Sequence, residues 1–291
     1  MKNIYVTTAE IKSYLGITSS THDTVLAMLN KMAADELNGI LSVSDLAFHK
    51  VTDEVHDGGE DRYELNDLNV RLIGDIYEDS TLYSQTEAYD IDNYVLHLED
   101  ALNGSEREVT IDYVAGWNAA GWTTLTITNN ATIADNMTIT IAPGGSGAVV
   151  LTEDTEWTTG ADATTTAADI AEAINNHASL GGAASGVRAF SIGAVIYVVD
   201  KEPQRKTSTI ALSDATGFTL ASNTLNGVVD FPESLRYANL LLIAGRFAKR
   251  KNAGVKSYTI GAKSVAFGSE SDANEFKGAI AQYKRAKLHV L

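Results

Sequence analysis

Two stretches with helical spacing of apolar residues open the chain. The segment TTAEIKSYLGI, which starts at residue 7, places Ile11, Tyr14 and Leu15 on one face behind a threonine that can cap the helix. The longer segment STHDTVLAMLNKMAADELNGIL, residues 20–41, repeats apolar residues near the same spacing. These residues are Val25, Met28, Leu29, Met32, Leu37 and Leu41. We expect this second helix to carry a large share of the first hydrophobic core.

Between Phe48 and Trp117 the pattern changes to short runs separated by turn residues, which is typical of strands. The clearest alternation of buried and exposed positions is Val109, Ile111 and Tyr113. The sequence Asp-Gly-Gly at 57–59 predicts a hairpin turn, because glycine tolerates positive φ. The segment therefore reads as a small antiparallel β meander.

Residues 119–227 have a different composition, dominated by Thr, Ala, Gly, Asn and Ser, with only four Lys or Arg. Thr-rich runs with apolar residues at period two predict strands that each bury one face. The segment TTTAADIAEAINNHASLGG, residues 164–182, interrupts them with helical spacing. The apolar strand positions are Leu125, Ile127, Ile139 and Ile141, and the helix face carries Ile170, Ala173, Ile174 and His177.

Helical spacing returns near the end of the chain. PESLRYANLLLIAGRFAKRKNAG, residues 232–254, begins with a proline suited to the first turn and ends in basic residues that favour a helix C-terminus. A final helix is predicted over 271–291. We therefore predict an α+β protein with a mainly helical core and a small antiparallel β meander. An inserted β-rich domain with one helix, residues 119–227, interrupts this core of residues 1–118 and 228–291.

Charge is distributed unevenly along the 291 residues, whose formal net charge is −16. Residues 229–291 hold 11 Lys or Arg against 5 Asp or Glu, whereas residues 45–112 hold 19 acids against 4 bases. Such an acidic body argues against a protein that grips nucleic acid through its phosphates. The acidic block is compatible with a solvated surface, a metal-binding surface or a wall that repels another polyanion.

Several kinds of chemistry have no signature in the chain. With no cysteine, disulfides, Cys-zinc sites and thiol nucleophiles are excluded. The histidines lack the H-E-x-x-H spacing, no G-x-S-x-G is present, and PGGSGA at 143–148 lacks the lysine of a phosphate loop. His56, Asp57, Glu60 and Asp61 offer possible ligands but depart from the calcium-loop pattern. We expect no metal, no cofactor, no enzymatic activity and no membrane association, and a metal-dependent hydrolase is the least favoured alternative.

The terminal segments resemble a known family, the head-to-tail connector or adaptor proteins of long-tailed bacteriophages. The resemblance rests on TTAEIKSYLGITSSTHDTVLAMLNKMAADEL, HDGGEDRYELNDLNVRLIGDIYED, VTIDYVAGW and PESLRYANLLLIAGRFAKRKNAGVKSYTIGAKSVAFGSESDANEF. In that family the VTIDYVAGW-like strand runs almost directly into the PESLRYA-like helix, whereas here residues 119–227 separate the two. The inserted segment looks like small β-rich modules of phage structural proteins.

The resemblance implies a structural virion protein at the neck, assembled in the host cytoplasm. Such adaptors form a ring of twelve subunits below the portal protein, extend the channel for double-stranded DNA, which passes without specific binding, and dock the next neck or tail protein. Basic residues near the C-terminus become candidates for portal or subunit contacts, with solubilising helix charges as the alternative. They are Arg246, Lys249, Arg250, Lys251, Lys284, Arg285 and Lys287.

Asp57, Glu60 and Asp61 are candidates for acids that line the channel and oppose adhesion of DNA. A second hypothesis is that the inserted domain decorates the virion and binds a glycan or another protein, with Trp122 or Trp157 as a stacking platform. The favoured reading of the tryptophans is packing, above all of Trp117 and Trp122 at the seam between core and insert.

Overall fold

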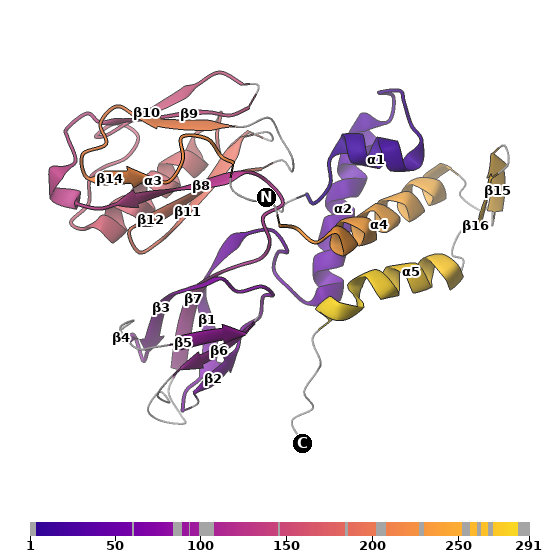
Figure 1. Ribbon diagram of the computed structural model, residues 1–291, viewed down its shortest axis with the longest axis horizontal. Helices are drawn as coiled ribbons and strands as arrows, with labels where there is room; N and C mark the ends of the chain where they lie inside the picture. Colours follow the sequence, from indigo (N-terminus) through magenta and orange to yellow (C-terminus); the bar gives the residue numbers. More distant parts are fainter. Residues whose placement is uncertain are drawn as a thin grey trace. The chain divides into compact units, whose positions relative to one another are not determined.

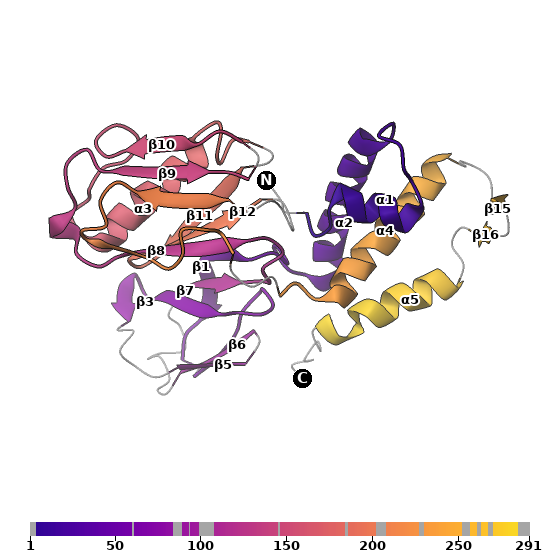
Figure 2. The ribbon, with the colours of Figure 1, turned by 45° about the horizontal axis from the view of Figure 1, so that its top comes forward.

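The computed structural model (Figures 1 and 2) describes most of the chain. The described residues are 4–59, 61–83, 89–92, 94–98, 108–144, 146–183, 186–201, 208–226, 230–251, 257–260, 263–266 and 270–284. Contacts divide the chain into two compact units. One joins Met1–Ser44 to Phe231–Leu291, and the other is Asp45–Asp230.

The first unit is built of helices from both ends of the chain, with α4 between α2 and α5 (Figures 1 and 2). Its elements are α1 (Thr8–Leu15), α2 (Asp23–Leu41), α4 (Glu233–Lys251), α5 (Glu270–Ile280), a 3-10 turn (Ala281–Tyr283) and the antiparallel strands β15 (Ser257–Ile260) and β16 (Lys263–Ala266). Thr7 and Glu10 cap α1 reciprocally, and Gly16 ends it at φ 67°. Val6, Ile11, Leu26, Leu29, Ala33 and Ile243 form its core.

Not all apolar residues of α2 are buried, which differs from the prediction. Leu29, Leu37 and Leu41 are buried as predicted, but Met28 is 56% exposed and Met32 is 44% exposed. The helix buries the stripe that contains Leu26, Leu29, Ala33 and Leu37 against its neighbours, and the methionines fall on another side of the helix.

Buried asparagines link the first and last parts of this helical unit. Tyr5 donates its hydroxyl to Asn38 Oδ1 at 2.6 Å, and its ring stacks on Phe231 with centroids 4.8 Å apart. Asn30 donates to the carbonyl of Val6 at 2.7 Å and accepts from Asn239 Nδ2 at 3.1 Å. All three asparagines are 1% exposed or less, so these hydrogen bonds fix which residues of α2 and α4 face each other.

The second unit begins with two small antiparallel sheets that share one core. The strands are β1 (His49–Asp57), β2 (Arg62–Glu64), β3 (Leu72–Glu78), β4 (Thr81–Tyr83), β5 (Tyr89–Asp92), β6 (Val95–Leu98) and β7 (Glu108–Ala115). They form the orders β1-β7-β3-β4 and β2-β6-β5. Val109, Ile111 and Tyr113 are buried in the shared core, as their alternation predicts.

The predicted hairpin at 57–59 is wrong. Strand β1 pairs with β7, and β2 pairs with β6, so the glycine turn leads from one sheet to the other. The segment is also no simple meander, because β7 lies between β1 and β3. Turn chemistry identified the change of direction but not the pairing partners, which are set by packing far along the chain.

The second part of this unit, which we call the β-rich module, packs two sheets and one helix around a single core. Its elements are β8 (Trp122–Ile127), β9 (Thr138–Ala142), β10 (Val149–Thr152), α3 (Ala163–Asn176), β11 (Val187–Ile192), β12 (Val195–Asp200), β13 (Thr209–Leu212), β14 (Phe218–Leu220) and a 3-10 turn (Asn130–Thr132). The sheet orders are β10-β9-β13 and β11-β12-β8-β14. The predicted strand and helix positions are buried as expected, except His177, which is half-buried.

An aromatic cluster joins the β-rich module to the sheets before it. Phe48 packs edge-on against Phe190 and Tyr197 with centroids 5.4 and 5.5 Å away, and Trp122 lies 5.9 Å from Phe48. Arg188 also donates to the carbonyl of Phe48. These contacts group residues 45–118 with residues 119–230 in one compact unit.

The two ends of the β-rich module meet at a small polar joint. Asn118 and Asp230 exchange hydrogen bonds, with the Asn118 amide 2.7 Å from Asp230 Oδ1 and the Asp230 amide 3.0 Å from the Asn118 carbonyl. Arg71 pairs with the same carboxylate and donates to the carbonyl of Gly116 at 2.9 Å. The chain therefore enters and leaves the β-rich module at one place.

The fold class is α+β, as predicted, but the description of a mainly helical core is wrong. The described part of the chain contains sixteen strands and five α-helices. Fourteen of these strands and one of the helices lie in residues 45–230, where apolar residues alternate with Thr in the manner of strands. Among the described residues, no helix is long and apolar enough to cross a bilayer.

Candidate functional site

The basic residues singled out in the sequence lie along α4 and after α5. Arg246 is paired with Glu36 of α2, with its Nη2 2.5 Å and its Nε 3.1 Å from Glu36 Oε2, so this charge already serves the contact between two helices. Lys249, Arg250 and Lys251 occupy the last turn of α4. Lys284 is exposed, whereas Arg285 and Lys287 lie outside the described residues.

The acids singled out in the sequence lie near the β1–β2 turn. Asp57 is exposed at the end of β1 and Asp61 is exposed just before β2, while Glu60 lies outside the described residues. No group of three or more potential metal ligands occurs among the residues that the structure describes. Exposed carboxylates of this kind repel phosphate and remain compatible with a surface that faces DNA.

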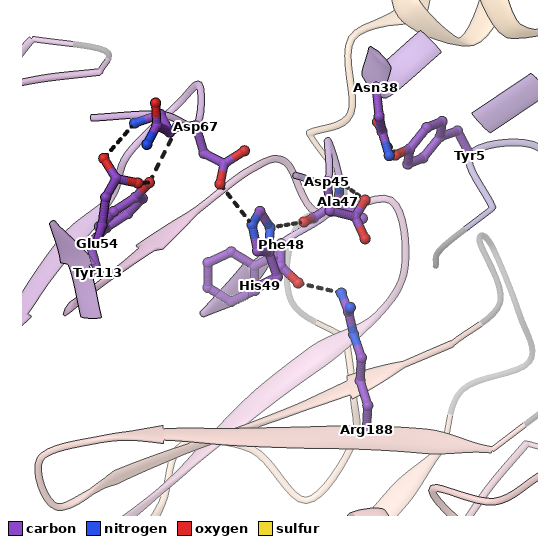
Figure 3. Close-up of polar contacts among 11 residues, drawn as sticks. Tyr5, Asn38, Asp45, Ala47, Phe48, His49, Glu54, Asp67, Tyr113 and Arg188 are labelled. Carbon is purple, nitrogen blue, oxygen red and sulfur yellow. Dashed lines mark hydrogen bonds and ion pairs between the residues drawn. The ribbon is translucent and has the colours of Figure 1, made fainter. Parts of the chain in front are cut away.

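A buried carboxylate that the sequence analysis missed lies at the centre of a polar network in the first sheets (Figure 3). A β-bulge between Val51 and Glu54, with Asp53 at φ 54°, turns Glu54 into the protein, where it is 8% exposed. Glu54 accepts from the Tyr113 hydroxyl at 2.5 Å and from the amide of Asn66 at 2.8 Å.

The electrostatics of this network favour one protonation state for each group. Burial would raise the pKa of Glu54, but its hydrogen bonds with His56, Tyr113 and Asn66 outweigh burial and lower the pKa below its ordinary value. Burial, together with the hydrogen bond and charge of Glu54, raises the pKa of Tyr113. Glu54 is therefore a carboxylate and Tyr113 a neutral donor, an arrangement that holds the 65–68 loop on the sheet.

His49 extends the same network toward the start of β1 (Figure 3). Its Nε2 lies 3.3 Å from Asp67 Oδ2, and its Nδ1 lies 2.7 Å from the carbonyl of Ala47. Burial alone would lower the pKa of His49, but the hydrogen bond and charge of Asp67, with the charge of Asp45, raise it above 6.5. Because both ring nitrogens face acceptors, the protonated ring satisfies both contacts.

The raised pKa predicts a pH-dependent contribution of His49 to stability. A group whose pKa is higher in the folded than in the unfolded state makes its full contribution to stability at pH values below the unfolded-state pKa. That contribution is lost as the pH rises through the folded-state pKa. Compared with His49→Gln, the wild type is expected to be more stable by a larger margin at pH 5.5 than at pH 8.5. Urea unfolding at both pH values measures the margin, with His97→Gln, an exposed position on β6, as the control. A margin that does not change with pH would contradict the assignment.

The structure explains why the segment VTIDYVAGW contains a glycine, Gly116. It has φ 91°, and a Cβ at this position would lie 2.6 Å from the carbonyl oxygen of Ala47 and 2.9 Å from that of Leu46. The close approach allows Trp117 to exchange backbone hydrogen bonds with Leu46 and Phe48 at 2.9 Å. This glycine therefore lets the chain that follows α2 lie directly against the end of β7.

The tryptophans pack rather than present open faces. Trp157 is 3% exposed and lies edge-on to Phe218, and Trp122 is half-buried against Phe48 and Tyr197. The packing of Trp122 at the seam agrees with the sequence interpretation. A sugar-stacking platform built on Trp157 is ruled out by its burial, since stacking needs an exposed face.

The β-rich module carries an open acidic hollow of about 490 Å³ beside α3. Thr158 donates to Asp169 at 3.1 Å in its wall, and Asn176 donates to Glu172 at 3.2 Å. No lysine or arginine lines it. Its wall is formed by Asp154, Thr155, Glu156, Trp157, Thr158, Asp169, Glu172, Ala173, Asn176 and His177.

One family model matches the C-terminal part of the chain. The family model described as "Phage gp6-like head-tail connector protein" matches residues 207–284, a segment that contains α4 and α5. This match confirms the resemblance for the C-terminal part of the chain. It supports the interpretation that the chain is a structural head-tail connector protein of a bacteriophage. No curated protein matches the chain.

A solved structure described as "Virion of native gene transfer agent (GTA) particle" is also similar to part of the chain. The likeness has 16% sequence identity and a TM-score of 0.31, and it covers 39% of this chain and 66% of that chain.

Proposed function

We propose that this protein is a non-enzymatic neck component of a long-tailed phage. In this proposal it forms a ring, of twelve subunits by resemblance, between the portal protein and the next neck or tail protein, and it extends the channel through which double-stranded DNA passes. The observation that carries the proposal is the match of residues 207–284 to head-tail connector proteins. We further propose that residues 119–227 are an insertion in a connector made of residues 1–118 and 228–291.

The described residues support a mechanical role. The helical unit is closed by contacts between its N-terminal and C-terminal segments, including ion pairs of Arg236 with Glu10 and Arg246 with Glu36. We propose that this unit acts mechanically, by holding its partners together. Lys284 and the cations at the end of α4 are proposed contacts with the portal or with neighbouring subunits.

An acidic surface suits a conduit for DNA. Asp57 and Asp61 are exposed, and the chain as a whole has a net charge of −16. Electrostatic repulsion therefore opposes the binding of DNA phosphates to such a surface. We propose that such acids line the channel and let DNA slide. Tight, salt-sensitive binding of duplex DNA by the assembled protein would count against this part of the proposal.

Loss of the protein is expected to separate heads from tails. In a phage with an early stop codon in this gene, we expect DNA-filled heads and free tails by electron microscopy and a drop in infectious titre of several orders of magnitude. Supplying the intact gene in the host should restore joined particles. Joined, infectious particles in the absence of the protein would refute the proposed function.

A further inference from the structure

Helix α2 has exposed apolar residues that no described residue of its own unit buries. Met28 is 56%, Met32 is 44% and Ile40 is 36% exposed, and they recur at spacings of four and eight residues. Ala27 and Lys31 are exposed beside them. Such spacing places Met28 and Met32 one turn apart on one side of the helix. Glu36, which pairs with Arg246, separates them from Ile40. We call Ala27, Met28, Lys31 and Met32 the methionine patch.

The methionine patch points away from the helices that α2 packs against. Leu26, Leu29 and Ala33 of the same helix are buried in the core that α2 forms with α1 and α4. Successive residues of a helix are 100° apart, so positions 28 and 32 lie off this buried stripe. Helical spacing predicts both methionines in the core, whereas in the folded chain they remain exposed and available for a contact with another molecule.

A second exposed apolar patch lies on other helices of the same unit. Tyr14 of α1 is 43% and Tyr237 of α4 is 38% exposed, and their rings meet edge-on with centroids 6.2 Å apart. Tyr237 donates its hydroxyl to Glu275 of α5 at 2.9 Å, and this hydrogen bond raises the pKa of Tyr237 to about 12. The patch is thus preorganised across three helices. We call Tyr14, Tyr237 and Glu275 the tyrosine patch.

The two patches are complementary in chemistry. Methionine side chains are flexible and polarizable and make favourable contacts with aromatic rings, worth about 0.3–1.5 kcal/mol for each sulfur. The exposed charge in the methionine patch is Lys31, a cation, whereas the tyrosine patch carries the carboxylate of Glu275. Glu233 lies one turn before Tyr237 on α4, and its side chain is 86% exposed although it pairs with Arg236 at 3.3 Å. Contact between the two patches would therefore bring apolar side chains together and also place Lys31 near a carboxylate.

We propose that the methionine patch of one copy docks on the tyrosine patch of the next copy. Because the two patches are different surfaces of one chain, the contact is head-to-tail, and contacts of this type generate rings when the rotation closes. A second copy is the favoured occupant because both halves of the contact, with matching charges, are present on this chain. The closure into a ring rests on the proposed function, while the pairwise contact does not.

Disulfide trapping tests the contact directly, since the natural chain has no cysteine. Full-length Met32→Cys and Tyr237→Cys proteins are mixed and oxidised, and each is also oxidised alone. We expect a cross-linked dimer in the mixture at least ten times more abundant than in either single sample, and a ladder of higher oligomers from the Met32→Cys/Tyr237→Cys chain. Val150→Cys, at an exposed apolar position of the β-rich module, mixed with Tyr237→Cys is the control.

The other outcomes contradict the proposal. A dimer formed by Met32→Cys alone would mean a symmetric contact through α2, and the absence of any cross-link above the control would mean that the patches do not meet. Charge reversal gives an independent check by sedimentation. Lys31→Glu and Glu275→Lys are each expected to weaken self-association about tenfold, and the double variant is expected to recover most of the loss.

The same cross-link distinguishes failure of this contact from failure of the proposed function. It is repeated in phage particles that carry the Met32→Cys/Tyr237→Cys chain. Particles that contain the protein at the neck but show no cross-link would overturn the contact and leave the neck function standing. Particles that lack the protein would overturn the neck function, whatever the purified chain does.

Discussion

Replacing Gly116 by alanine is expected to destabilise the Asp45–Asp230 unit by about 3–5 kcal/mol, the sum of strain at positive φ and of overpacking. The added Cβ would meet the Ala47 carbonyl oxygen at 2.6 Å and its carbon at 2.7 Å, and both belong to backbone that cannot rotate away. Relief requires the 46–48 segment to move off β7, which would break its hydrogen bonds with Trp117. Denaturant unfolding, monitored by fluorescence, measures the change.

Gly147→Ala is the matched control for this variant. Gly147 is exposed, and an added Cβ has no heavy atom within 4 Å. A change within about 0.5 kcal/mol is expected there, as for most surface substitutions. Equal effects of the two substitutions would contradict the close approach described for Gly116.

Replacing Asn30 by leucine is expected to cost the helical unit about 2–4 kcal/mol, because it leaves two buried groups without partners. The carbonyl of Val6 loses its donor, and the amide of Asn239 loses its acceptor. Asn30 is 1% exposed and Asn239 is fully buried, so water does not replace the lost bonds. Thermal unfolding of the full-length chain is the measurement.

A double variant separates the contribution of the Asn30–Asn239 hydrogen bond from that of side-chain packing. In Asn30→Leu/Asn239→Leu, the orphaned amide is removed together with its lost acceptor. The combined loss is therefore expected to be smaller than the sum of the two single losses by about 1 kcal/mol or more, as coupled residues show. Strict additivity would mean that the two asparagines do not form the hydrogen bond through which α2 and α4 meet.

Local patterns in the sequence were sufficient for most of the secondary structure. The cap of α1 at Thr7, the alternation at Ile139 and Ile141, and the face of α3 around Ile170 and Ile174 all depend on neighbours a few residues away. Such short-range rules act before any tertiary contact is known. They therefore predicted the elements and their buried faces well.

Features set by distant contacts were missed for identifiable reasons. A bulge at Asp53 changes which face of β1 Glu54 occupies, and a shift of one residue reverses the face of every following side chain. Met28 and Met32 fit a helical core pattern, but α2 buries only part of its apolar surface. Phe48 joins the β-rich module through Phe190, which lies more than a hundred residues later. None of these three features can be recognised from the residues that neighbour it in the sequence.

The sequence identified candidate contact residues by charge alone, and the structure gives them different surroundings. Arg246 stabilises the packing of α4 on α2 through Glu36, so it serves the unit itself as well as any partner. Charge runs do not reveal which cations have an internal partner. The tyrosine patch was missed because its members come from three helices that the sequence does not show to be neighbours.

The most direct test of the neck assignment is electron microscopy of the portal protein of the same phage mixed with this protein. The account predicts an added ring of density on the tail side of the portal, with the helical unit placed against it. A portal whose image is unchanged at saturating concentrations of this protein, while the protein is found elsewhere on the virion, would contradict the account.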